Sequence, residues 1–186
     1  MISIRNYLRG FRDEERGSIA VETVLILPVL FWGYLSMFAI FDAYRQHSIN
    51  QKAAYTIGDI ISRETNPLDM AYLTGTREML AYLTANDTYD VAVRVTSVTY
   101  DEDNDEYVKY WSEKKGWMPK LSNEAIQALR DDLPVMPDNE TVIVVETFVK
   151  YDPPFNTGLQ TREIHNFVFT RPRYAPQVLW NEPTTY

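Results

Sequence analysis

The sequence lacks cysteine altogether and contains only two histidines among its 186 residues. Without cysteine the chain has no disulfide framework, no thiolate metal site and no cysteine nucleophile. The histidines, His47 and His165, fall on a predicted helix and a predicted strand, so they form no histidine-rich metal site. We interpret His165 as structural.

Catalytic motifs are missing as well. The chain has no Gly-x-Ser-x-Gly nucleophile elbow, no phosphate-binding glycine-rich loop and no His-Glu-x-x-His motif. The acidic run Asp101–Glu106 begins like a calcium loop, but Glu106 takes the glycine position and Ser112 the position of the bidentate glutamate. We therefore expect a solvated hairpin tip, and a protein that has no catalytic residues, no metal and no cofactor and is not an enzyme.

Positive charge is scarce outside the N-terminus. The net charge is -8, although the first 17 residues carry four arginines against three acids. The rest of the chain is therefore strongly acidic, which argues against nucleic acid or an anionic lipid surface as a partner of this larger part.

A long apolar run, Gly17 to Phe41, is the main feature that the sequence does contain, with Glu22 as its one ionisable residue. The 13 Ile, Leu, Val and Phe residues from Ile19 onward favour membrane insertion by about 4 to 8 kcal/mol together. An acid at the centre of a span costs about 2.5 to 3.5 kcal/mol, which is an upper bound for Glu22 because it lies near one end of the run. The run therefore predicts a transmembrane helix over residues 18–41.

Two alternatives to a membrane span remain for this run. A core helix that is apolar on every side needs a large surrounding domain. A cleaved secretory signal has an apolar core of about 7 to 15 residues that ends at a small-x-small site, which this run lacks. Four arginines precede the run, whereas only Arg45 and Lys52 follow it closely, so the positive-inside rule places the N-terminus in the cytoplasm.

The junction before the run carries the most specific pattern. Gly17 follows Arg16, the apolar run begins at once, and Glu22 is the fifth residue counted from Ser18. This pattern resembles the processing site of type IV pilin-like precursors, in which a prepilin peptidase cuts after the glycine. With Leu27-Pro28-Val29-Leu30 and a downstream domain of this size, it resembles more narrowly the TadE-like family of minor pseudopilins of tight-adherence (Flp) pili.

The resemblance covers about Arg12 to Phe41, plus the closing Arg171-Pro172-Arg173-Tyr174. Thr23 departs from the pattern, because many Flp-type sequences have an aromatic or small apolar residue after the glutamate. The resemblance implies cleavage of the charged leader, residues 1–17, by a prepilin peptidase. It also implies a single-pass bacterial inner-membrane protein with a periplasmic C-terminal domain, which joins or primes a pilus used in cell adhesion. The implied partners are other pilin or pseudopilin subunits, the inner-membrane pilus assembly platform and membrane lipid.

Glu22 can also be interpreted from its chemistry. An acid one turn inside a membrane helix usually faces a partner rather than lipid. After cleavage, the new α-amino group of Ser18 is largely cationic at neutral pH, and Glu22 of one subunit could pair with the amine of its neighbour. The alternative is that Glu22 only interacts with the helix dipole, which is worth about 0.3 to 1 kcal/mol.

Farther along the same helix, Pro28 cannot donate a hydrogen bond to the carbonyl of Val24 and should therefore bend the helix.

The remaining patterns predict an α+β fold. We expect the first helix to continue beyond Phe41, and an antiparallel sheet to pack on it. The second helix should begin at Asn66-Pro67, end at Asn86-Asp87, and bury Leu68, Tyr72, Met79 and Leu83. The other predicted elements are strands over Tyr89 to Tyr100, Glu106 to Trp111, Thr141 to Tyr151 and Arg162 to Thr170, and a short helix over Ser122 to Leu133.

The predicted domain covers residues 42–171, and the tail 172–186 is rich in proline and aromatic residues. The tail should either cross the domain as a strap or dock on another subunit. For the whole chain, the alternative to a pseudopilin is an uncleaved inner-membrane scaffold whose outer domain binds components of the pilus or secretion machinery. A tethered hydrolase is a third hypothesis, for which the sequence offers no catalytic residues.

Overall fold

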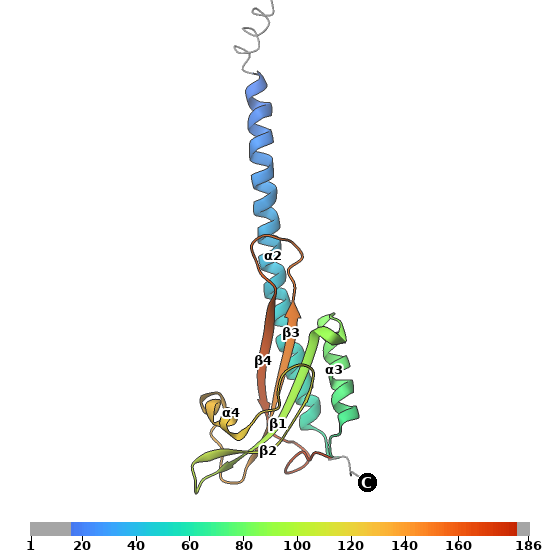
Figure 1. Ribbon diagram of the computed structural model, residues 1–186, viewed down its shortest axis with the longest axis vertical. Coiled ribbons are helices and arrows are strands. Elements are labelled where there is room, and N and C mark those ends of the chain that lie inside the picture. The colour runs from blue at the N-terminus through green and yellow to red at the C-terminus, as the bar shows by residue number, and fades with distance from the viewer. Residues whose placement is uncertain (1–15, 182–186) are drawn as a thin grey trace, which may run out of the picture. The chain divides into compact units, whose positions relative to one another are not determined.

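The computed structural model describes residues 16–181, with side chains from Ile19 onward. Most of the predicted leader and the last five residues of the predicted tail lie outside this range. The described chain is α+β, as predicted (Figure 1). Its helices are α2 (Arg16–Ser62), α3 (Met70–Thr84) and α4 (Asn123–Ala128), and the short 3-10 turns are η1 (Thr88–Asp90) and η2 (Arg130–Asp132).

Helix α2 runs through two compact parts of the chain. The first part contains α2 as far as Ala43 together with the loop Pro153–Gln160. The second part contains Tyr44–Asp152 and the chain from Thr161 onward. The sheet, α3 and α4 all belong to the second part.

The sheet has four antiparallel strands in the order β2-β1-β3-β4. The last two strands have the predicted bounds, and β2 runs four residues beyond its predicted end at Trp111. A register shift between Ser97 and Val98 interrupts the pairing of β1 with β2. The strands are β1 (Val91–Asp101), β2 (Glu106–Lys115), β3 (Thr141–Tyr151) and β4 (Arg162–Thr170).

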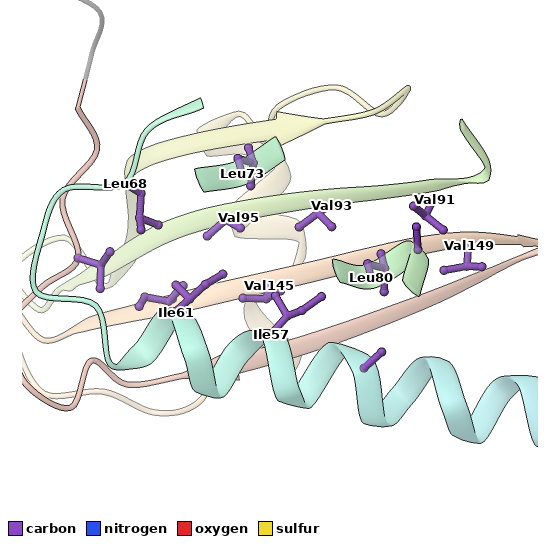
Figure 2. Packing of buried hydrophobic residues seen from close by; sticks show 14 of the residues in the cluster. Ile57, Ile61, Leu68, Leu73, Leu80, Val91, Val93, Val95, Val145 and Val149 are labelled. Carbon is purple, nitrogen blue, oxygen red and sulfur yellow. The ribbon is translucent and has the colours of Figure 1, made fainter. Parts of the chain in front are cut away.

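Each face of the sheet packs against different helices. One core cluster joins α2 and α3 to alternate valines of β1 and β3, and Figure 2 shows Ile57 and Ile61 directed from α2 towards Val145. A second cluster places Ile126 of α4 against Val144 of β3. Because successive strand residues point to opposite faces, α4 covers the face that α2 and α3 leave free.

Helix α3 begins three residues later than predicted. Asp69, rather than Asn66, caps it, and its carboxylate accepts a hydrogen bond from the backbone N–H of Tyr72 at 2.7 Å. Leu68 cannot be helical because its main chain pairs with the tail, donating to the carbonyl of Leu179 at 2.8 Å. A contact with a distant segment therefore overrides the local Asn-Pro signal.

The buried face of α3 is also different from the prediction. Leu73 and Leu80 are buried, whereas the predicted Leu83 is 37% exposed. Two threonines share the buried face, because Thr76 donates to the carbonyl of Tyr72 and Thr84 to that of Leu80. A threonine whose hydroxyl is satisfied within its own helix can be buried at little cost.

Helix α4 is shorter than predicted. Ser122 caps it as expected, accepting from the N–H of Ala125 at 3.2 Å. The helix ends at Ala128 and the chain continues as η2, so the predicted helix to Leu133 is wrong in its second half. Leu133 is nevertheless buried with Ile126, which keeps the predicted apolar contacts.

The tail crosses the domain as a strap as far as it is described. Val178 is fully buried, and its carbonyl accepts a hydrogen bond from the indole N–H of Trp111 at 2.9 Å. The rings of Trp111 and Trp180 lie 5.5 Å apart, and Trp180 forms a parallel bridge with Leu68. These contacts attach the tail to β2 and to the segment before α3.

Replacing Gly116 by alanine is expected to destabilise the domain by about 1 to 3 kcal/mol through overpacking. Gly116 has φ +135°, and a Cβ atom there would lie 2.1 Å from Cβ of Ala92. Gly75 is the matched control, because a Cβ atom on it meets nothing within 4 Å. In α3, Gly75→Ala should stabilise by about 0.5 to 1 kcal/mol. Urea unfolding of both variants measures the difference, and equal stabilities would contradict the packing of Gly116 on β1.

Candidate functional site

Gly17 and Ser18 lie in helix α2, of which the structure describes Arg16–Ser62. The processing role of both residues stays a prediction.

Glu22 lies one turn beyond Ser18 and is exposed. Two polar side chains in the same half of α2 have acceptors within the helix: Thr23 donates to the carbonyl of Ile19 at 2.7 Å, and Ser36 to that of Trp32 at 2.8 Å. A carboxylate cannot do this, because it has no proton to donate. Among the side chains that the structure describes, from Ile19 to Asn181, none is hydrogen-bonded or ion-paired with Glu22.

Pro28 lies inside α2, and the helix continues through it. Proline has no N–H, so the carbonyl of Val24 lacks its usual intrahelical donor at this point. The bend predicted at Pro28 is untested.

The first half of α2 exposes a continuous apolar surface. Fifteen large hydrophobic side chains between Ile19 and Phe41 are each at least 44% exposed. Helix α2 is long and apolar enough to cross a membrane, and is compatible with a single-pass membrane protein. In the second part of the chain the same helix buries Ile57 and Ile61 completely. The helix thus changes from an uncovered apolar surface to an ordinary packing face along its length.

The sheet contains a cluster of buried charged side chains. Arg94 on β1 holds Glu146 on β3 with two hydrogen bonds, Nε to Oε2 at 2.6 Å and Nη2 to Oε1 at 2.7 Å. Its third contact is from Nη1 to the carbonyl of Pro119 at 2.8 Å. His165 on β4 places Nε2 3.1 Å from Oε1 of Glu146, and its ring stacks on Phe148 at 4.4 Å.

The environment of Glu146 explains its ionisation. Burial by itself would raise the pKa of the Glu146 carboxyl, but hydrogen bonds from His165 and Arg94 and the charge of Arg94 hold that pKa below its usual value. Glu146 is 1% exposed and Arg94 8% exposed. The cluster joins three neighbouring strands, and the structural interpretation of His165 agrees with its place there.

The acidic hairpin tip uses its carboxylates within the protein. Asp101 accepts hydrogen bonds from the backbone N–H and the amide of Asn104, and Asp105 from Tyr100 and Arg130. These bonds lower the pKa of both carboxyls. Within residues 16–181 no group of three or more His, Asp and Glu side chains is placed to hold a metal ion.

A shallow hollow of about 480 Å³ lies between the start of α3, β2 and the tail. Its charged groups already have partners: Asp69 caps α3, and Lys120 donates to Glu113 at 2.5 Å. Trp180 forms part of its wall.

Sequence reasoning missed the pair Arg94–Glu146, although Arg94 lies between two valines and Glu146 directly follows the apolar run 142–145. Charged side chains are rarely buried without a partner. Two charges of opposite sign in two predicted strands were therefore the available signal for a buried ion pair. The candidate site that remains for function is the uncovered half of α2 with its acid, Glu22. No protein-family model matches the chain, and neither curated proteins nor solved structures give a match.

Proposed function

We propose that the chain is a minor pseudopilin of a tight-adherence (Flp-type) pilus. A prepilin peptidase removes residues 1–17, and the mature N-terminal helix packs with the helices of other pilin or pseudopilin subunits to prime or join the pilus. Before assembly the protein is held in the bacterial inner membrane, with its N-terminus in the cytoplasm and its domain in the periplasm. The inner-membrane assembly platform is the expected partner for extraction from the membrane.

The uncovered apolar half of α2 is the observation that carries this proposal. Fifteen large hydrophobic side chains remain exposed there. Removing the exposed surface of all fifteen from water is worth on the order of 10 to 20 kcal/mol. Soluble monomers rarely expose apolar surface on this scale. Lipid can cover this surface before assembly, and neighbouring helices can cover it in a filament.

Glu22 supports assembly over permanent anchoring. An acid without a described partner in an apolar helix is costly in lipid unless another group meets it. Cleavage after Gly17 would create a cation at Ser18, one turn before Glu22. A staggered neighbour could bring that amine to Glu22 and fix the axial register of the two helices.

The N-terminus of the mature protein tests the proposal. We expect the protein isolated from its native host to begin at Ser18, as measured by intact mass and N-terminal sequencing. Substitution Gly17→Val should leave the leader attached, because a branched side chain at the cut hinders the extended fit that a peptidase needs. Gly10→Val makes the same change inside the leader and should still be cleaved. Wild-type protein that retains Met1 to Gly17 would exclude the pseudopilin and support the uncleaved scaffold.

A further inference from the structure

The loop Pro153–Gln160 packs on the predicted membrane span. The rings of Phe38 and Phe155 meet edge to face, with centroids 5.7 Å apart and planes at 68°. Both residues belong to the first compact part of the chain. Phe38 lies three residues before Phe41, the last residue of the predicted span.

The helix geometry sets the level of this contact. Each residue of an α-helix advances by about 1.5 Å, so Phe38 lies about 4.5 Å inside the end of the span along the helix axis. Phe155 touches Phe38, so it lies at about the same level. If α2 crosses a membrane over residues 18–41, the loop must meet the boundary between headgroups and acyl chains.

The composition of the loop suits that boundary. No charged residue occurs between Asp152 and Arg162, in a chain of which 24% is charged. Phe155 remains 39% exposed after packing on Phe38, so part of its ring is available to lipid. Phenylalanine is one of the apolar side chains that interfacial protein segments bury at the boundary between headgroups and acyl chains.

The main chain of the loop limits its depth. A loop has backbone groups without partners in regular structure, and these cannot enter hydrocarbon without a large cost. The tip makes one tight turn, in which the N–H of Thr157 donates to the carbonyl of Phe155 at 2.9 Å. The headgroup region, which still contains water, is therefore the environment that fits both the backbone and the aromatic side chain.

We propose that the loop Pro153–Gln160 is a second membrane contact, in which Phe155 inserts at the lipid interface beside the outer end of the span. This inference rests on the part of the proposed function in which α2 spans a membrane, and it does not depend on cleavage after Gly17. It makes membrane lipid the partner of a loop that joins β3 to β4.

The absence of cysteine allows a direct test with single labelled cysteines in the full chain. A fluorophore is attached to Asn156→Cys, which leaves Phe155 intact. The labelled protein is reconstituted in liposomes that contain nitroxide-labelled phosphatidylcholine. Leu30→Cys reports the span and Val135→Cys, where the valine is 93% exposed, reports water. We expect the lipid nitroxide to quench the fluorophore at Asn156→Cys several-fold more than the fluorophore at Val135→Cys. Iodide, which stays in water, should quench the fluorophore at Asn156→Cys less than the one at Val135→Cys. Adding Phe155→Ser should abolish this difference.

The outcomes separate the loop from the span. If Leu30→Cys is quenched by lipid while Asn156→Cys behaves like Val135→Cys, the loop inference fails and the span stands. If Leu30→Cys is not quenched by lipid, the span fails and the proposed function fails with it. Shielding of Asn156→Cys from both quenchers, increasing with the protein-to-lipid ratio, would show that a neighbouring subunit rather than lipid covers the loop, and would also overturn the inference.

Discussion

Replacing Glu146 by glutamine is expected to destabilise the folded domain by about 3 to 5 kcal/mol, because it leaves a buried arginine without its counter-ion. Arg94 donates two hydrogen bonds to this carboxylate, and the amide can accept only at its oxygen. A loss of this size is a large fraction of the 5 to 15 kcal/mol by which most domains are stable. Urea unfolding of the full chain in detergent, followed by tryptophan fluorescence, measures the change.

Asp90→Asn is the matched control for this substitution. It makes the same acid-to-amide change in the ion pair between Asp90 and Lys150, and both of these side chains are about half exposed. Such a pair is worth only about 0 to 1 kcal/mol. In the double variant Arg94→Met, Glu146→Leu both charges are gone, so the loss should be smaller than in Glu146→Gln alone. A Glu146→Gln variant no less stable than Asp90→Asn would contradict the importance of the buried pair.

The contribution of Glu146 to the free energy of unfolding should also depend on pH. The pKa of its carboxyl is lower in the folded state than its usual value of 4.5. The stabilisation by the ionised group is therefore fully present above about pH 4.5, and is lost as the pH falls through the folded-state pKa. The difference in unfolding free energy between wild type and Glu146→Gln should narrow in this acidic range.

Glu22→Ala is expected to leave cleavage after Gly17 intact and to reduce assembly into pili by about 10- to 150-fold, the equivalent of a charged hydrogen bond of about 1.5 to 3 kcal/mol. The peptidase acts on one subunit, whereas the proposed pairing of Glu22 with the amine of Ser18 joins two. Intact mass measures cleavage, and the amount of this chain in sheared pili measures assembly.

Thr23→Ala is the control for Glu22→Ala. It removes a polar group from the next position, but the hydroxyl of Thr23 is already bonded to the carbonyl of Ile19. Assembly should therefore stay close to wild type. Normal piliation by Glu22→Ala would show that Glu22 interacts only with the dipole of its own helix.

Elements with a clear local pattern were predicted well from the sequence. The bounds of β3 and β4 agree with prediction, because alternating β-branched and aromatic residues end at turn residues on both sides. Helix α3 was misplaced because its start depends on the pairing of Leu68 with the tail, about 110 residues away in the chain. No local pattern contains that information.

The candidate site was predictable to a similar degree. Glu22 could be found from the sequence because it is the single acid in an apolar run. The contact of Phe155 with Phe38 could not, since nothing local connects a loop between two strands with a helix more than 100 residues earlier. The pairing of Arg94 with Glu146 depends on the register of β1 with β3, which only the assembled sheet defines.

The strap formed by the tail determines when the domain can finish folding. Val178 fills the core beside the valines of β1 and β3, so the core stays incomplete until the chain has been synthesised as far as this residue. A chain that stops before this residue would expose the indole of Trp111 and an open apolar surface, which proteases and chaperones recognise. A copy that lacks this segment therefore differs in its exposed apolar surface from a copy that contains it.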